Sequence, residues 1–236
     1  MTEVALIAGA GPGLGAALAR RFAASGMRVA IAARRRGAIE TLAREVSAET
    51  GGTLEAFALD VTDEAAVDAL FAHVRTHWEE PTLVVYNAGA YLPAGILDTS
   101  AADFERCWKV GCQGGFLVGK EAVRGMLRRG GGTLLFPGAT ASLRGSARFA
   151  NLAVGKFGLR ALAQCMAREF GPKGIHVGHV VIDGGIREHD DPRASPSAPH
   201  SLLEPDAIAE AYYQLHLQPR SAWTLELDLR PWVERF

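Results

Sequence analysis

Four glycines near the amino terminus have the spacing of a loop that could bind phosphate. They are Gly9, Gly11, Gly13 and Gly15 in the segment AGAGPGLG, residues 8–15, which overlaps the end of the apolar run VALIAGA. Glycines allow a tight turn and a close backbone approach, and the amides that open the following helix would face an anion with the help of the helix dipole. In a strand, loop and helix setting the segment therefore predicts a pyrophosphate site; a merely flexible turn is the alternative.

A single interior cation, Lys156, stands in the mostly apolar segment RFANLAVGKFGL, residues 148–159. A buried ammonium group without a partner is costly, so this side chain needs a partner or a path to water. It could face a ligand cleft, or its ammonium group could reach solvent at the edge of a helix. The small neighbours Gly155 and Gly158 would let this helix approach another surface closely, such as a symmetry-related copy.

The segment AIAARRR, residues 30–36, carries basic residues where a second strand would end. NAD-binding Rossmann proteins place an acidic residue there to accept from the ribose 2′-hydroxyl, and here Ala33 occupies the approximate position. Arg34 follows, and a guanidinium group suits a 2′-phosphate. The pattern favours NADP(H) over NAD(H); a solvated charge run of Arg34, Arg35 and Arg36 on a turn is the alternative.

These residues need a framework, and the chain alternates short apolar runs with helical patterns. Strands are expected at 4–10, 28–33, 54–60, 82–88, 133–139, 175–182 and 223–229, and helices near 14–25, 37–50, 63–77, 101–129, 147–170 and 205–216. Thr62 is expected to cap the third helix, and Pro205 with Asp206 to open the last one. This alternation predicts one α/β domain over residues 1–236, a doubly wound Rossmann fold with about seven parallel strands and right-handed crossovers.

The composition is that of a globular domain without a strong charge bias. Hydrophobic residues make up 48% and charged residues 22% of 236, and the formal net charge is -1. A protein with so little net charge has no long-range electrostatic attraction to nucleic acid or to an anionic membrane, so the expected partner is a small molecule or a protein. Three cysteines without metal-type spacing, no cleavable leader and no bilayer-spanning run indicate a cytoplasmic protein. His73 and His77 stand one helical turn apart without a third ligand, so no metal is expected.

Further segments extend the pattern of the glycine loop. Its spacing G-x-x-x-G-x-G from Gly9, the segment LDVTD at 59–63, the segment YNAG at 86–89 and the position of Lys156 together resemble the short-chain dehydrogenase/reductase (SDR) superfamily. Tyr86 replaces the first asparagine of the family's N-N-A-G segment. The resemblance covers essentially the whole chain, and by analogy it implies a homodimer or homotetramer.

The resemblance also implies a set of cofactor contacts. Asp60 would bond the adenine amino group, Val61 would flank the adenine ring, and Lys156 would donate hydrogen bonds to the nicotinamide ribose hydroxyls and share in catalysis. The full expected set is Gly9, Gly11, Gly13, Leu14, Gly15, Arg34, Asp60, Val61, Asn87, Ala88, Gly89, Lys156, Gly184 and Ile186.

The chain departs from the family pattern at the positions that move the proton. The family tyrosine four residues before the lysine corresponds to Leu152, and a related branch that places its tyrosine seven residues before corresponds to Phe149. The family serine aligns with Ala139 and the family asparagine with Gly111. None of these side chains can donate a proton. The chain thus keeps the family's nucleotide-binding residues but has other residues at the family's proton-transfer positions.

Replacement proton donors are few. Tyr91, two residues beyond the YNAG segment, is the leading candidate, although an aromatic residue that lines a pocket is the simpler interpretation. Thr140 and Ser142 could substitute for the serine only if their loop shifts. The segment 184–203 is expected to be a substrate loop, with plain surface disorder as the alternative. Further polar candidates near it are Asp183, which replaces the proline of the family's Pro-Gly, His189 and Asp190.

Two classes of function follow from these patterns. The first is an NADP(H)-dependent oxidoreductase that moves a hydride to or from a small hydrophobic carbonyl or alcohol, with another proton donor or water. Leu143, Phe149 and Leu152 would give its pocket apolar walls. The second is a catalytically inactive nucleotide-binding protein that acts as a sensor or as a subunit beside an active relative.

Overall fold

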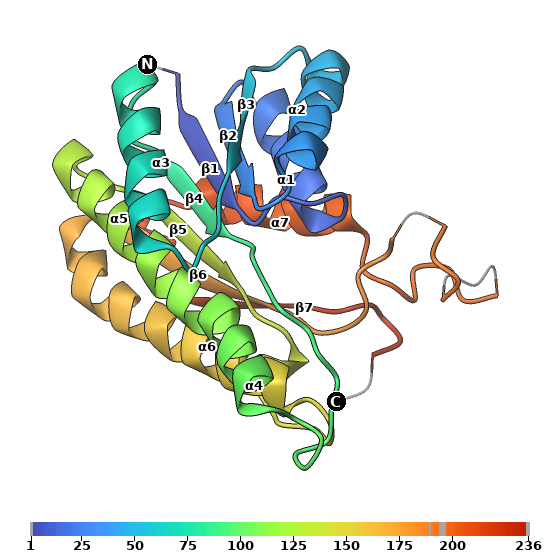
Figure 1. The fold of residues 1–236 in the computed structure, drawn as a ribbon. Coiled ribbons are helices and arrows are strands. Elements are labelled where there is room, and N and C mark those ends of the chain that lie inside the picture. The colour runs from blue at the N-terminus through green and yellow to red at the C-terminus, as the bar shows by residue number, and fades with distance from the viewer. Residues whose placement is uncertain (1, 189, 194–196, 235–236) are drawn as a thin grey trace.

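The computed structural model of the chain describes residues 2–188, 190–193 and 197–234, and it shows an α/β protein built on one sheet (Figure 1). The strands are β1 (Val4–Ala8), β2 (Arg28–Ala33), β3 (Leu54–Ala58), β4 (Leu83–Tyr86), β5 (Gly132–Pro137), β6 (Ile175–Ile182) and β7 (Glu226–Leu229). They form a 7-stranded sheet in the order β3-β2-β1-β4-β5-β6-β7, and all neighbouring pairs are parallel. The predicted single Rossmann-type fold is confirmed.

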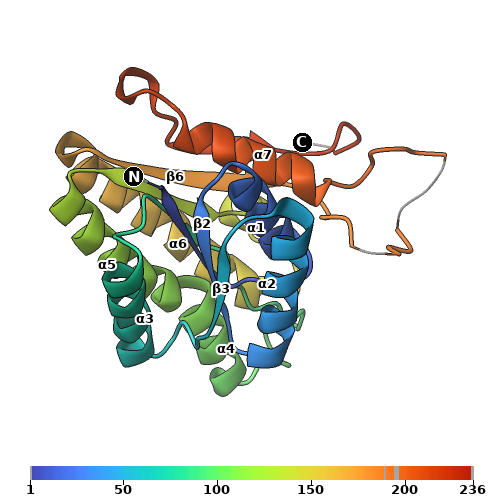
Figure 2. The ribbon, with the colours of Figure 1, turned by 90° about the horizontal axis from the view of Figure 1, so that it is seen from above.

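Helices cover both faces of this sheet. They are α1 (Leu14–Ala24), α2 (Arg36–Thr50), α3 (Glu64–His77), α4 (Ala101–Trp108), α5 (Gly114–Arg129), α6 (Ala150–Phe170) and α7 (Pro205–His216). Figures 1 and 2 show α1, α2 and α7 on one face and α3, α5 and α6 on the other, with α4 packed on α6. Each face therefore has its own hydrophobic core.

Strand β1 shows why the strands are apolar along their whole length. Leu6 and Ala8 pack with the α3, α5 and α6 layer, whereas Ala5 and Ile7 pack with the α1, α2 and α7 layer. Successive side chains alternate between the two faces, so a sheet covered on both sides needs apolar residues at every position. Because β1 pairs with both β2 and β4, the winding reverses there, and such a reversal leaves a ligand crevice at the carboxyl ends of the strands.

The long helix expected near 101–129 is interrupted by a π-helical turn, Lys109–Gln113, between α4 and α5. This turn lies against α6, where a Cβ atom added to Gly111 would lie 3.3 Å from the Cα atom of Gly155. A Cβ atom added to Gly158 would meet a cysteine of the same turn. The close approach expected of Gly155 and Gly158 is therefore made to a segment of their own chain.

Several expected boundaries were wrong by one to three residues, among them the start of α3 and the start of β7. The N-cap of α3 is Asp63, whose carboxylate accepts from the Ala66 amide at 3.1 Å, and not Thr62. The Thr62 hydroxyl instead donates to the Asp60 carboxylate at 2.7 Å, in the turn before the helix. The last strand, expected from residue 223, begins at Glu226, after a short 3-10 turn.

Candidate functional site

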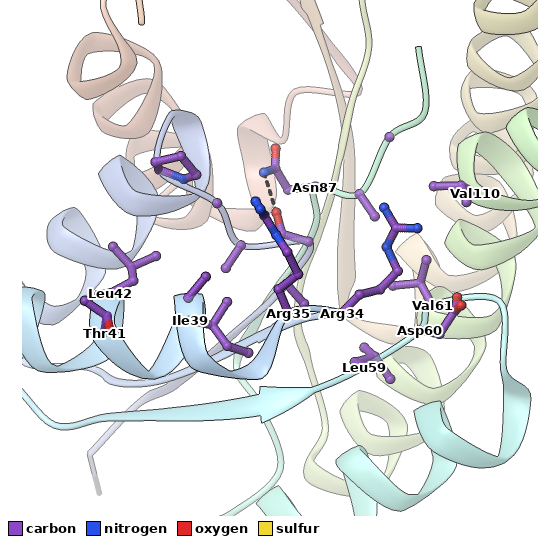
Figure 3. A pocket seen from close by; sticks show the side chains of 18 of the residues that line it. Arg34, Arg35, Ile39, Thr41, Leu42, Leu59, Asp60, Val61, Asn87 and Val110 are labelled. Carbon is purple, nitrogen blue, oxygen red and sulfur yellow. Dashed lines mark hydrogen bonds between the residues drawn. The ribbon is translucent and has the colours of Figure 1, made fainter. Parts of the chain in front are cut away.

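A cavity of about 730 Å³ opens at the carboxyl edge of the sheet, where the loops after β1, β2, β3 and β4 come together (Figure 3). The residues of the expected cofactor set that line it are Gly9, Gly11, Arg34, Asp60, Val61, Asn87, Ala88 and Gly89. The sequence patterns did not assign the other lining residues to the cofactor; these include Ala10, Pro12, Arg35, Ala38, Ile39, Thr41, Leu42, Glu45, Leu59 and Val110. The lining residues on α2 belong to an ordinary helical repeat of apolar residues. Such a repeat does not indicate that one side of the helix borders a cavity.

Gly9 is required by the backbone around it. Its φ is 102°, and a Cβ atom added there would lie 2.2 Å from the amide nitrogen of Ala88. The Gly9 amide donates to the Ala32 carbonyl at 2.8 Å, and its carbonyl accepts from Asn87 Nδ2 at 2.9 Å. The glycine loop is thus fixed between the end of β2 and the segment that follows β4.

The rest of the glycine loop leaves room for a ligand. Cβ atoms added to Gly11 or Gly13 would meet no other atom within 4 Å, whereas one added to Gly15 would lie 2.8 Å from the Cα atom of Ala10. Helix α1 begins at Leu14 with no side-chain cap and no acidic residue in its first turn, so no side chain competes for its first amides. This cradle of backbone amides fits a pyrophosphate group.

The charged residues of the cavity come from the ends of β2 and β3. Figure 3 shows the Arg34 and Arg35 side chains extending from the end of β2 into the cavity. Asp60, after β3, accepts from the Thr62 amide at 2.9 Å and from the Thr62 hydroxyl. These bonds lower the pKa of Asp60, and the Arg34 cation adds a smaller effect in the same direction. The cavity thus combines guanidinium donors at the end of β2 with a carboxylate acceptor at the end of β3.

Lys156 lies on α6, partly buried, and its ammonium group donates to the Pro137 carbonyl at 2.8 Å. Pro137 ends β5, so this bond directs the ammonium group to the carboxyl edge of the sheet rather than along the helix to solvent. Loss of hydration lowers the pKa of Lys156 to about 8. Lys156 does not line the cavity described above, and its place beside β5 puts it farther along the same edge.

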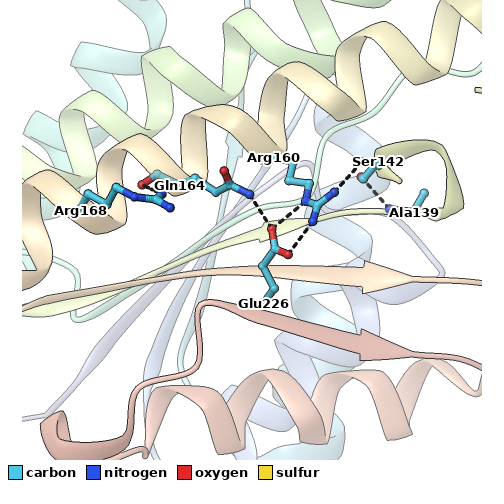
Figure 4. Close-up of polar contacts among 6 residues, drawn as sticks. All are labelled: Ala139, Ser142, Arg160, Gln164, Arg168 and Glu226. Carbon is cyan, nitrogen blue, oxygen red and sulfur yellow. Dashed lines mark hydrogen bonds and ion pairs between the residues drawn. The ribbon is translucent and has the colours of Figure 1, made fainter. Parts of the chain in front are cut away.

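An ion pair holds the loop that follows β5, where a 3-10 turn covers Thr140–Ser142. Arg160 on α6 contacts the Glu226 carboxylate of β7 with two nitrogens, at 2.7 and 2.8 Å, and points a third nitrogen at the Ser142 carbonyl (Figure 4). Ser142 in turn accepts from the Ala139 amide at 3.1 Å. The Arg160 hydrogen bonds lower the pKa of Glu226 to about 2.

His179 lies beneath this loop and was not singled out in the sequence. The imidazole is fully buried on β6, and neither ring nitrogen has a hydrogen-bond partner among the described residues. Burial lowers the pKa of His179 to about 4. A Cβ atom on Gly138 would lie 2.4 Å from the ring, so the loop can pass over His179 only with glycine at this position. A histidine inside the apolar strand IHVGHVVI was the one available signal.

Aromatic residues form a wall beside the loop that follows β4. Tyr91 is 60% exposed, and its ring lies 5.6 Å from that of Phe149, centroid to centroid. The Ala94 amide donates to the Arg148 carbonyl at 3.1 Å, which ties this loop to the start of α6. Leu152 lies on the first turn of α6, one turn before Lys156.

Two residues of the expected set lie beyond β6 and outside the cavity. Gly184 has a φ of 146°, and a Cβ atom there would lie 2.7 Å from Pro231, so the chain turns at this glycine. Ile186 forms an isolated bridge with Leu203. Within the expected substrate loop, residues 189 and 194–196, His189 among them, lie outside the described residues. A second cavity, about 900 Å³, joins this loop to the glycine loop and is lined by Pro12, Gly13, Arg20, Arg187, Glu188, Asp190, Asp191, Glu204 and Pro205.

The described ranges lack features of a metal site or of a membrane span. They contain no group of three or more histidine, cysteine, aspartate or glutamate residues that could hold a metal ion. The rings of His73 and His77 stack on each other, with centroids 4.0 Å apart. Across the same ranges, none of the helices combines the length and the apolar character that crossing a bilayer requires.

Comparisons with known proteins agree with this architecture. The family model described as short chain dehydrogenase matches residues 3–187. A short-chain dehydrogenase/reductase of Armillaria gallica is 34% identical over 177 residues, which cover 74% of this chain and 68% of that protein. A solved short-chain dehydrogenase from Rhodopseudomonas palustris is 40% identical with a TM-score of 0.85, covering 98% of this chain and 99% of the other.

A third relative was solved with a nucleotide. It is an alcohol dehydrogenase from Thermococcus sibiricus complexed with 5-hydroxy-NADP, 26% identical with a TM-score of 0.87, and the match covers 100% of this chain and 99% of that one. The chain therefore belongs to the short-chain dehydrogenase family, an oxidoreductase family whose fold binds nicotinamide cofactors.

Proposed function

We propose that this chain is an enzyme that transfers a hydride between NADP(H) and a small hydrophobic carbonyl or alcohol. The observation that carries the choice of NADP(H) is the pair of arginines, Arg34 and Arg35, that line the cavity at the end of β2, where Ala33 stands in place of a carboxylate. A carboxylate there would repel a 2′-phosphate, and guanidinium groups bind phosphate with charge-assisted hydrogen bonds.

The other residues of the expected set take roles that suit their positions. The amides after Gly13 would hold the pyrophosphate, Asp60 would accept from the adenine amino group, and Lys156 would donate to the nicotinamide ribose at the end of β5. Gly184 and Ile186 would border the nicotinamide beyond β6. When bound, the nicotinamide supplies or accepts the hydride.

The substrate site is proposed to be atypical and apolar. Leu152, Ala139 and Gly111 stand where the family resemblance expects the tyrosine, serine and asparagine that assist proton transfer. The exposed contact of Tyr91 with Phe149 supports an apolar wall for the substrate. Water, or the Tyr91 hydroxyl, would then supply the proton, and positioning of the hydride would carry much of the rate enhancement.

The segment 184–203 is proposed to close over the substrate, since the second cavity lies between part of it and the glycine loop. A homodimer or homotetramer is proposed from the family resemblance. It is supported by the ring of Phe116 on α5 and that of Phe157 on α6, which are 46% and 43% exposed. Such apolar exposure on two neighbouring helices is typical of a surface covered by a second copy.

The role of Arg34 can be tested by calorimetric titration of matched variants with NADPH and NADH. Arg34→Ala is expected to weaken NADPH binding about 10- to 100-fold and to change NADH binding little, because only NADPH carries the 2′-phosphate. Arg36→Ala removes the same charge two residues later, from a side chain that pairs with Glu40 and does not line the cavity. Equal losses for both variants, or equal losses for both cofactors, would contradict the assignment.

A further inference from the structure

Asp183, the first residue after β6, is a buried carboxylate that pairs with an arginine without a hydrogen bond between them. It is 5% exposed, and its Oδ1 atom accepts a hydrogen bond from the Thr140 hydroxyl. The nearest cation in the described part of the chain is the Arg230 guanidinium, 3.8 Å from Oδ2, which is beyond hydrogen-bond distance. Arg230 also pairs with Asp228, so its charge is shared by at least these two carboxylates among the described residues. Among the described residues this cluster therefore has two carboxylates, Asp183 and Asp228, around one guanidinium group.

The position of this carboxylate is set by the topology of the sheet. The cavity that fits the adenosine half of a dinucleotide is built at the carboxyl ends of β1 to β4. A dinucleotide in this fold crosses the point where the winding reverses, so its nicotinamide half belongs over the carboxyl ends of β4, β5 and β6. Thr140 follows β5 and Asp183 follows β6, which puts the pair at that end of the cleft.

We propose that Asp183 makes the chain bind the oxidised nicotinamide cofactor more tightly than the reduced one. This inference rests on the proposed NADP(H) function. The oxidised ring carries a positive charge and the reduced ring carries none, while the rest of the molecule is the same in both forms. A carboxylate in a partly dehydrated cleft attracts only the charged ring, and the Coulomb attraction is stronger there than in bulk water.

Lys156 is the cation at the same end of the cleft that would act in the opposite direction. Its ammonium group donates to the Pro137 carbonyl, and the partial negative charge of that oxygen offsets part of the repulsion. The consequence concerns the direction of the reaction. Transfer of the hydride and its two electrons from the reduced ring to the substrate carbonyl carbon would leave the ring as the cation that Asp183 attracts, so the hydride-donating direction would be favoured on the protein by the same factor as binding.

The test compares the dissociation constants of NADP+ and NADPH, measured by calorimetry near neutral pH with the full chain. Asp183→Asn keeps an acceptor for the Thr140 hydroxyl and removes the charge. It is expected to lower the preference for NADP+ over NADPH about tenfold, through weaker NADP+ binding. Asp68→Asn, on the exposed face of α3, makes the same change in net charge and should leave the preference unchanged.

A second variant tests the same inference if Asp183→Asn does not fold. Arg230→Gln removes the cation that lies 3.8 Å from the Asp183 carboxylate and should increase the preference for NADP+. A preference that stays at the wild-type value in folded Asp183→Asn or in Arg230→Gln overturns the inference. Failure of the wild type to bind either form would instead refute the proposed function, so the two failures are distinguishable.

Discussion

Replacing Gly9 with alanine probes the junction on which the cofactor cavity depends. Two costs add at this position. Alanine at a φ of 102° is strained by about 1–3 kcal/mol, and its Cβ atom would lie 2.2 Å from the Ala88 amide nitrogen and 2.5 Å from the Ala88 Cα atom. Relief of that overlap requires a shift of the backbone after β4, which costs about another 1–3 kcal/mol. We expect Gly9→Ala to lose about 4 kcal/mol of unfolding free energy.

The assay is thermal unfolding followed by circular dichroism, in which this loss corresponds to a midpoint lowered by about 10 °C for a chain of this size. Gly11→Ala is the matched control, because Gly11 has no positive φ and a Cβ atom there meets nothing within 4 Å. The free energy of unfolding of Gly11→Ala should be within about 0.5 kcal/mol of the wild-type value. An unchanged midpoint for Gly9→Ala, or a loss as large for Gly11→Ala, would refute the reasoning.

Two further predictions concern the far end of the cleft. The folded pKa of Glu226 is about 2 against an ordinary value of 4.5, so its pairing with Arg160 stabilises the fold fully above about pH 4.5 and is lost as the pH falls toward 2. Glu226→Gln should lower the free energy of unfolding in urea by about 2 kcal/mol at pH 7, after allowance for the partial exposure of Glu226, and the variant should lose less stability than the wild type as the pH falls. The same loss of stability at acid pH in both proteins would contradict this. Leu152→Tyr should raise NADPH-dependent reduction of a carbonyl probe such as benzaldehyde, about 100-fold or more if proton donation limits turnover, and an unchanged rate would contradict that limit.

The sheet was predictable because its signal is local. Each apolar run between turn residues becomes a strand, and a strand followed by a helix admits essentially one handedness of connection. The glycine loop was predictable for the same reason, since Gly9, Gly11, Gly13 and Gly15 lie within one short segment that follows β1.

Features made by residues far apart in the chain were not predictable. The π-helical turn Lys109–Gln113 has no proline to mark it, and its position depends on the contact between Gly111 and Gly155 and on the bond from the Tyr86 hydroxyl to the Val110 carbonyl. The sequence patterns likewise carried no sign of the pairing of Arg160 with Glu226, because 66 residues separate the two.

The cavity lining shows the same limit. Arg34 was expected to face the cofactor because of its place at a strand end, whereas Ile39 and Leu42 line the cavity because α2 lies beside it. A helical repeat of apolar residues looks the same whether the helix packs only on the sheet or also borders a ligand. Position after a strand is therefore the stronger signal for a binding residue in this fold.

The proposed function depends above all on a cleft that binds NADP(H) in preference to NAD(H). Its most direct test is a pair of calorimetric titrations of the wild-type protein, one with NADPH and one with NADH, under the same conditions. We expect NADPH to bind at least about tenfold more tightly, because Arg34 and Arg35 would meet a 2′-phosphate that NADH lacks. Equal affinities, or tighter binding of NADH, would contradict it.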